Sequence, residues 1–256
     1  ITRDGLVYVA DKGKHLVHVF TETGEFIRSF GNEIAGVAEL TNRPSKMSFG
    51  ANGQVYILNN NTSSIHVFSV QETLVQQWTP TSTNEGKFHS PQGVTISPAG
   101  LIYVTGFWNA RVQVFTAEGD FLFSWGEFGS EEGNFTSPWA ISASPNGQIY
   151  VLESRRVQVF TAEGEFVRSW GSRGSGKGEF GTAQGIAVSP DGEVYVADTG
   201  NHRIQVFSAE GEFIRSWGKI GPDNDEFRHP SGISVDADGV VYIADLGNQK
   251  IKVFTA

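Results

Sequence analysis

The feature that most constrains the fold of this chain is a repeat with a period of about 47 residues. All six tyrosines occupy the same position of the repeat, at spacings of 48, 47, 47, 45 and 47 residues: Tyr8, Tyr56, Tyr103, Tyr150, Tyr195 and Tyr242. A single unit of this size cannot bury its apolar faces alone, so stacked copies have to bury them together. The sequence therefore predicts an array of six similar units.

One unit, residues 185–218, contains four short apolar runs, at residues 186–188, 194–197, 204–207 and 213–217. Turn-forming residues separate the runs, as in Pro190-Asp191-Gly192 and Ala209-Glu210-Gly211. These turns leave no room for helical crossovers, so neighbouring strands are expected to pair antiparallel. Each unit should form a four-stranded antiparallel sheet.

The inner strands of a unit differ from its outermost strand. Residues 194–197 are apolar on both faces of the strand, whereas residues 213–217 mix polar and apolar side chains. Strands that are apolar on both faces need sheets packed on either side of them, and radial stacking of the sheets provides this. We therefore expect one all-β domain over residues 1–256.

The turns between the second and third strands carry a recognisable pattern. The run Asp198-Thr199-Gly200-Asn201-His202-Arg203 is echoed by Asp245-Leu246-Gly247-Asn248-Gln249-Lys250. This pattern resembles the NHL repeat, with Arg or Lys in place of its leucine, and the resemblance is strongest in the fourth to sixth units. It implies a six-bladed β-propeller, that is, an all-β fold of four-stranded antiparallel blades.

The first and last blades are expected to be incomplete. The first unit begins after most of its innermost strand, and the last ends at Thr255-Ala256, before its outermost strand. Twenty-two strands are thus predicted where six blades need twenty-four. We expect the chain to be an excerpt of a longer protein, in which it forms one monomeric propeller that an upstream segment closes.

Charge divides the two ends of the expected blades. Half of the 28 acidic residues lie on or beside the turns after strands one and three, but only five of the 19 basic residues do: Arg3, Arg28, Arg168, Arg215 and Lys252. The whole formal charge of −9 is therefore assigned to that end. The opposite end, with the strand 2–3 loops and the blade-to-blade connections, is neutral and is the expected binding surface.

The candidate ligand-binding residues are unusual aromatic and basic side chains in the loops of the third and fourth units. They are Phe107, Trp108, Arg111, Trp139, Arg155 and Arg156. Exposed aromatic residues beside arginine are typical of interaction hot spots. The competing interpretation is that Phe107 or Trp108 folds back over its blade and that Arg111 and Arg156 pair with Glu153 as Arg203 pairs with Asp198.

The residues expected nearest the propeller axis carry no catalytic chemistry. They are Ser48, Thr95, Ser142, Ala187 and Ser234, which have neither carboxylate nor imidazole groups. We therefore expect no catalytic residue, no metal site and no cofactor. The resemblance implies a recognition module for a protein or peptide. The alternatives are single-stranded RNA binding, which the pI of about 5.1 disfavours, and a propeller lyase or lactonase.

Overall fold

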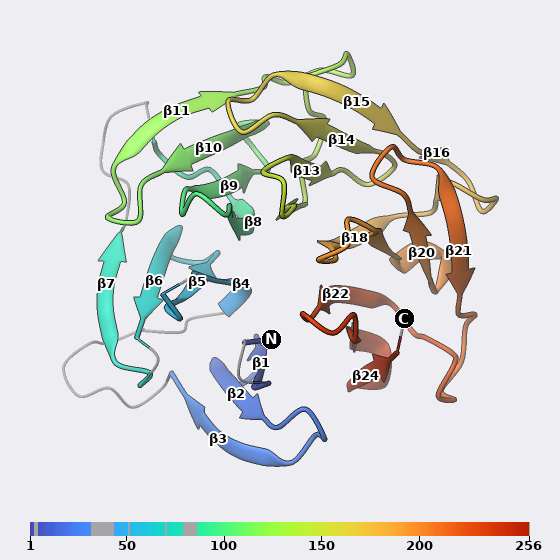
Figure 1. Ribbon diagram of the computed structural model, residues 1–256, viewed down its shortest axis with the longest axis horizontal. Helices are drawn as coiled ribbons and strands as arrows, with labels where there is room; N and C mark the ends of the chain where they lie inside the picture. Colours follow the sequence, from blue (N-terminus) through green and yellow to red (C-terminus); the bar gives the residue numbers. More distant parts are fainter. Residues whose placement is uncertain (3–4, 32–43, 51, 70, 79–85, 256) are drawn as a thin grey trace. The chain divides into compact units, whose positions relative to one another are not determined.

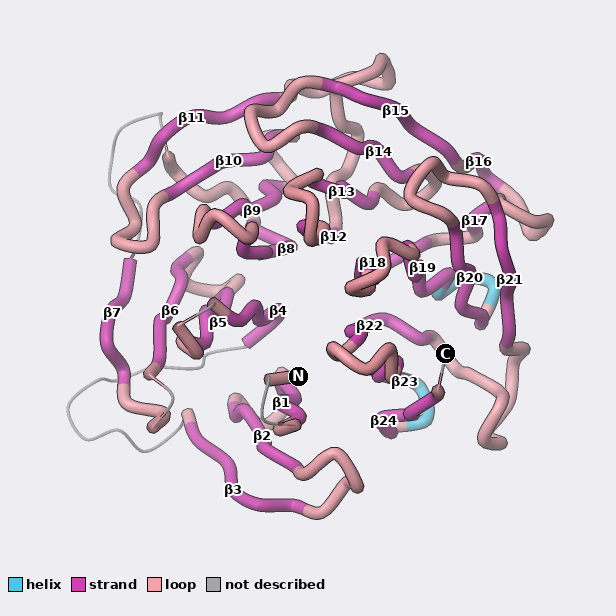
Figure 2. The backbone as a smooth tube through the Cα atoms, in the orientation of Figure 1, coloured by secondary structure: helices cyan, strands magenta, loops and turns pink. Residues whose placement is uncertain are grey.

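The structure is a computed structural model, and it describes residues 1–2, 5–31, 44–50, 52–69, 71–78 and 86–255 (Figure 1). Arg3, which the charge comparison used, lies outside the described residues. The chain divides into two compact units, Ile1–Ser124 and Trp125–Ala256. Nearly all of the described regular structure is strand, with two short 3₁₀ turns, as the tube in Figure 2 shows.

The first unit contains three antiparallel sheets. A three-stranded sheet has the order β1-β2-β3, and the next sheet has the order β4-β5-β6-β7. The third sheet has the order β11-β10-β9-β8. Their bounds are β1 Val7–Asp11, β2 Leu16–Phe20, β3 Phe26–Phe30, β4 Pro44–Phe49, β5 Val55–Asn59, β6 Ser64–Phe68, β7 Leu74–Trp78, β8 Pro91–Ile96, β9 Ile102–Gly106, β10 Arg111–Phe115 and β11 Phe121–Trp125.

The second unit contains the fourth, fifth and sixth repeats. Two four-stranded sheets, β12-β13-β14-β15 and β18-β19-β20-β21, are followed by the three-stranded sheet β22-β23-β24. Their bounds are β12 Ala140–Ala143, β13 Ile149–Leu152, β14 Val157–Phe160, β15 Phe166–Trp170, β18 Ala183–Val188, β19 Val194–Asp198, β20 Arg203–Phe207, β21 Phe213–Trp217, β22 Pro230–Val235, β23 Val241–Asp245 and β24 Lys250–Phe254. The 3₁₀ turns are η1 Thr199–Asn201 and η2 Leu246–Asn248.

The expected fold class is confirmed. One antiparallel meander per repeat makes the chain an all-β protein of the six-bladed β-propeller class, with three strands in its first and last sheets. Among the described residues, these six sheets contain the twenty-two strands that the repeat predicts. The structure adds a parallel pair in one connection, β16 Ser172–Arg173 with β17 Glu179–Phe180. No helix in the described part of the chain is long and apolar enough to cross a membrane.

The repeated tyrosines and prolines have clear local roles. Tyr103, Tyr150 and Tyr195 are among the largest fully buried side chains, which confirms their place in the core. Proline begins β4, β8 and β22, where its missing N–H is tolerated at a strand end. The pairing register with the second strand shifts between Pro91 and Gly93 and between Pro230 and Gly232, so these strands begin with a bulge.

A tryptophan at the end of one sheet packs against a turn glycine of the next sheet within the same unit. A Cβ on Gly119 would lie 2.7 Å from the Trp78 ring, and one on Gly211 would lie 2.6 Å from the Trp170 ring. Both glycines have a positive φ, +89° and +93°. The Ala-Glu-Gly turns therefore need glycine for their conformation and also for close approach between sheets.

Candidate functional site

The candidate binding surface is the end of each sheet that carries the strand 2–3 turn and the connection from the preceding sheet. We call it the loop end. In the third and sixth sheets the strand 2–3 turn is held against the residues that precede the first strand: Phe107 N donates to Ser90 O at 3.1 Å, and Gly247 N donates to Arg228 O at 2.7 Å. Backbone bonds thus fix the position of these loops.

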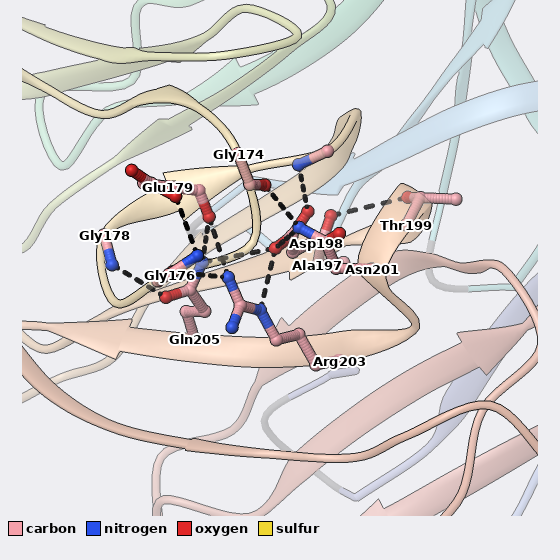
Figure 3. Close-up of polar contacts among 11 residues, drawn as sticks. Gly174, Gly176, Gly178, Glu179, Ala197, Asp198, Thr199, Asn201, Arg203 and Gln205 are labelled. Carbon is pink, nitrogen blue, oxygen red and sulfur yellow. Dashed lines mark hydrogen bonds and ion pairs between the residues drawn. The ribbon is translucent and has the colours of Figure 1, made fainter.

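A buried carboxylate organises the loop end of the fifth sheet (Figure 3). Asp198 is fully buried and accepts hydrogen bonds from Gly181 N at 2.9 Å, Asn201 Nδ2 at 2.8 Å and Arg203 Nε at 2.9 Å. Gln205 Nε2 donates to the same carboxylate at 3.3 Å. These contacts confirm the expected pairing of Arg203 with Asp198, and they offset the cost of burying the charge.

The same side chains hold the connection that leads into the fifth sheet. Arg203 Nη2 donates to Gly176 O at 2.7 Å and to Glu179 O at 2.9 Å. Gln205 accepts from Gly178 N at 3.1 Å and donates to Glu179 O at 2.8 Å. We call this set of bonds to a connection the clamp. It explains why the fourth and fifth repeats both combine an acidic residue, an arginine and a glutamine at the loop end, because these side chains satisfy backbone groups of the connection.

The fourth sheet has a clamp despite its shorter loop. Glu153 pairs with Arg156 at 2.5 Å and also accepts from Thr136 N at 2.7 Å. Gln158 accepts from Gly133 N at 3.0 Å and donates to Asn134 O at 2.8 Å. The loop lacks the residue equivalent to Asn201, and the backbone and hydroxyl of Thr136 supply donors to the carboxylate instead.

The sixth sheet builds its clamp from a lysine. Lys252 Nζ lies 3.2 Å from Asp245 Oδ2 and donates to the carbonyl oxygens of Asp223 and Glu226 in the connection. The sequence analysis assigned Lys252 to the acidic end, with the turns after strands one and three, and the structure corrects this. Its ammonium group is directed to the loop end, because the residue occupies the strand position that Gln205 has in the fifth sheet.

Three of the candidate residues lie in the first unit. Trp108 is 78% exposed, and its ring meets that of Phe107 edge to face at 5.2 Å between centroids. Arg111 is exposed at the start of β10, and Phe107 is partly buried. The structure therefore brings the two aromatic side chains together and presents the tryptophan to solvent.

The other three candidates lie in the second unit. Trp139 is partly buried and packs against the core cluster that includes Tyr150. Arg155 is exposed, whereas Arg156 is engaged with Glu153 and with the carbonyl of Asn134 at 2.8 Å. Arg156 thus has the intramolecular partner that the competing interpretation expected, whereas the pairing of Arg111 with Glu153 stays a prediction. That all six candidates form one binding patch stays a prediction.

The opposite ends of the sheets carry ion pairs between acidic turns and outer strands. Arg215 donates to both carboxylate oxygens of Glu193 at 3.0 and 2.9 Å, and also to the Tyr195 hydroxyl at 2.9 Å. Burial, followed by the Glu193 carboxylate, raises the pKa of Tyr195 to about 12. This tyrosine therefore stays protonated and acts as a hydrogen-bond donor to Glu193, which it contacts at 2.9 Å.

Sequence reasoning missed Lys46, which stands at the position where β8, β18 and β22 have glycine. Burial, with a smaller contribution from Lys12, lowers the pKa of Lys46 to about 8. The signal in the sequence was the Pro44-Ser45-Lys46 run, which departs from the Pro-x-Gly of the sister repeats. No group of three or more His, Cys, Asp or Glu side chains that could hold a metal occurs in the described part of the chain.

Large exposed hydrophobic side chains fall into two sets. One set lies in the outermost strands of the sheets, as Val75, Val167 and Ile214 do. The other lies in loop-end segments and is more exposed: Trp108 at 78%, Phe128 at 81%, and Ile220 and Leu246 at 66% each. Trp108 and Leu246 lie in strand 2–3 turns, and Phe128 and Ile220 lie in connections.

Comparison with sequence families gives a family match. The NHL repeat matches residues 88–115, 180–207 and 227–254, which contain the first three strands of the third, fifth and sixth sheets. The fourth repeat, whose strand 2–3 loop is two residues shorter, is not among the matches. The chain therefore contains NHL repeats on a six-bladed β-propeller. No curated protein sequence matches it.

Several solved structures have a similar fold. A streptogramin B lyase structure superposes with a TM-score of 0.70 and 16% identity over 98% of this chain and 76% of that one. Virginiamycin B lyase from Staphylococcus aureus gives 0.68 and 14% over 100% and 82% of the two chains. Kuenenia stuttgartiensis hydrazine synthase gives 0.67 and 13% over 100% and 94%. At these identities the likeness shows the fold alone.

Proposed function

We propose that this chain is a non-catalytic recognition module that binds a protein or peptide through its loop end. The observation that carries the proposal is the set of exposed hydrophobic side chains in loop-end segments, led by Trp108 and Phe128. Aromatic side chains that extend from a fixed loop supply large contact area at low entropic cost when a partner covers them. The clamps support this role, because they hold the connections that present Phe128 and Ile220.

Two other functions remain as alternatives. Single-stranded RNA could stack on Trp108, but the chain has a formal charge of −9 and a pI of about 5.1, and RNA affinity comes largely from basic contacts to phosphates. A lyase or lactonase activity is compatible with the fold, since two of the similar structures are lyases, but their identity to this chain is only 14–16%. No observation in the described residues favours either alternative over protein or peptide binding.

The test is affinity capture from a lysate of the source cells with four forms of the protein as bait. Trp108→Ser and Phe128→Ser remove loop-end hydrophobic side chains, and Ile214→Ser is a matched control because Ile214 is 43% exposed on an outermost strand. We expect a protein partner that is captured by wild type and the control and reduced at least tenfold by the loop-end variants. A partner retained equally by every form would contradict the proposal.

Two further arms separate the alternatives. A captured RNA that is released between about 50 and 200 mM salt would indicate phosphate contacts and would replace the protein proposal by RNA binding. Treatment of the lysate with ribonuclease should leave the proposed partner bound. Turnover of a small molecule by wild type and the Ile214→Ser form would indicate an enzyme.

A further inference from the structure

Two histidines meet where the loop ends of the fifth and sixth sheets adjoin. His202 follows η1 in the strand 2–3 turn of the fifth sheet, and His229 directly precedes β22 of the sixth sheet. Their rings meet edge to face, with 4.8 Å between centroids. The backbone N–H of His229 donates to Nδ1 of His202 at 3.2 Å. A side chain of one sheet therefore accepts a hydrogen bond from the backbone of the next.

This hydrogen bond determines where the His202 ring carries its proton. A neutral imidazole has one N–H group and one bare nitrogen, and only the bare nitrogen can accept. Because Nδ1 faces a donor, the proton of the neutral ring lies on Nε2. A second proton would have to bind at Nδ1, where it converts the acceptor into a donor that points at another N–H group. The bond between the two sheets therefore exists only while His202 is neutral.

His229 is held from its other side by the turn of the sixth sheet. Its carbonyl oxygen accepts from Leu246 N at 3.3 Å. The residue thus links two turns, because its N–H group bonds to the fifth sheet and its C=O group bonds to the sixth. Thr199 Oγ1 donates to Pro230 O at 2.6 Å without involving either imidazole, so β22 itself stays attached when the His202 bond is lost.

Charges of both signs surround His202. Burial and then the neighbouring His229 lower its pKa below the ordinary value, and Asp245 and Asp198 act weakly in the opposite direction. Both carboxylates are already engaged in ion pairs, so they do not compensate for a charge on His202. The charged groups of the elements packed around the ring are Asp198, Arg203, Lys219, Glu226, Arg228, His229, Asp245 and Lys252.

The backbone at this junction does not require histidine. His202 and His229 both have positive φ angles, +56° and +58°. The corresponding residues of the second and third sheets are Ser63 and Ser90, with φ of +50° and +53°. Serine does not titrate, yet it occupies the same conformation. The histidine pair therefore adds a property that the fold itself does not need.

We propose that this junction is a pH-sensitive switch, in which protonation of His202 at Nδ1 releases the backbone N–H of His229. The bond is present while the ring is neutral, and it is lost as the pH falls through the titration of the ring. Leu246 bonds to the released residue and carries one of the exposed loop-end side chains, so the change reaches the loop end. The inference goes beyond the proposed function, because it holds whatever the loop end binds.

The first test is ¹⁵N NMR of the imidazole rings, because nitrogen shifts report which ring nitrogen carries a proton. At about pH 7.5, where an ordinary histidine is neutral, His202 should carry its proton on Nε2, and a coupling should connect Nδ1 to the amide nitrogen of His229. On acidification Nδ1 should gain a proton, and the coupling should vanish with the same midpoint. A proton on Nδ1 at neutral pH, or a coupling that outlasts the titration, would overturn the proposal.

The second test follows amide hydrogen exchange, corrected for the intrinsic pH dependence of the exchange rate. Protection of the His229 amide should fall at least about threefold when its hydrogen bond is lost between about pH 7.5 and about pH 5. The Gly192 amide is the internal control, since it bonds to Ser189 O at 3.0 Å in a turn at the opposite end of the fifth sheet. An equal fall at Gly192 would show that acid loosens the whole sheet, and it would refute a local switch.

Two variants separate the acceptor from the charge of the second ring. His202→Asn places Oδ1 as many bonds from the backbone as Nδ1, so it keeps an acceptor that does not titrate, and asparagine tolerates the positive φ. His229→Ser removes the second ring but keeps the backbone N–H group. The acid-induced fall in protection at position 229 should disappear in the first variant and persist in the second.

The control variant is His89→Ser, because His89 is an exposed histidine of the first unit, and it should behave as wild type. A fall in protection that survives His202→Asn would assign the effect to another group and overturn the proposal. A fall that is abolished by His229→Ser would assign it to repulsion between the two rings, and this too would overturn release by protonation of Nδ1.

Discussion

Substitution of alanine for Gly211 tests the packing between neighbouring sheets of the second unit. Gly211 has φ of +93°, and a Cβ there would lie 2.6 Å from the Trp170 ring. That ring cannot move away easily, because it packs against Phe207 at 5.8 Å and Tyr150 at 6.2 Å between centroids. Gly192 is a matched control, since it has the same φ of +93° and no atom within 4 Å of a built Cβ.

The two substitutions differ only in what the new methyl group meets. Placing alanine in a left-handed conformation costs about 1–2 kcal/mol, and this is the whole expected loss of unfolding free energy for Gly192→Ala. Overpacking adds about 1–3 kcal/mol, so Gly211→Ala should lose about 2–5 kcal/mol in total. Each kilocalorie corresponds to roughly 2–4 °C in Tm for a chain of this size.

The measurement is urea unfolding followed by circular dichroism. The unfolding midpoints of the two variants are compared, provided that their m values, the slopes of unfolding free energy against urea concentration, are equal. A double-mutant cycle with Trp170→Ala isolates the contact, because Gly211→Ala should then lose no more than Gly192→Ala does. Equal losses for the two glycine variants in the wild-type background would refute the reasoning. They would mean that the turn of the fifth sheet is not in contact with the tryptophan of the fourth.

Three other predictions concern charged groups. Asp198→Ala leaves Arg203 partly buried without its carboxylate and should lower the unfolding free energy by about 3–5 kcal/mol in urea titrations, whereas an unchanged midpoint would contradict the clamp. Lys46 should titrate near pH 8 by NMR of ¹³C-methylated lysines, and a value near its ordinary 10.5 would show that it is not buried. Burial and the neighbouring His229 lower the pKa of His202 below 6.5, so the unfolded chain takes up the proton first. Stability should therefore fall as pH drops below about 6.5, and His202→Gln should weaken that fall in urea titrations; a dependence unchanged by the substitution would refute the assignment.

The fold could be predicted from the sequence because each repeat contains its own turn signals and its own core residues. Turn signals such as Pro190-Asp191-Gly192 leave room only for antiparallel neighbours, and the tyrosine equivalent to Tyr195 marks the same strand position in every repeat. The parallel pair of β16 and β17 was not predictable in this way. It forms between residues of one connection, and its pairing depends on how the clamp side chains hold that connection.

The candidate site was predictable only in part. Trp108 was identified because it departs from the repeat, and it is indeed exposed. Trp139 departs from the repeat equally, yet its side chain packs against the core. The residues that surround it come from other strands, so its own position in the repeat could not reveal this burial.

The clamp also has a consequence for synthesis on the ribosome. Asn201 bonds to Gly174 across a separation of 27 residues, and Arg203 bonds to Gly176 across the same distance. Each connection therefore emerges well before the side chains that secure it, and it stays unsecured until the third strand of the following sheet has been made. Nascent chains should consequently acquire order one repeat at a time, with each new third strand closing the loop that was translated before it.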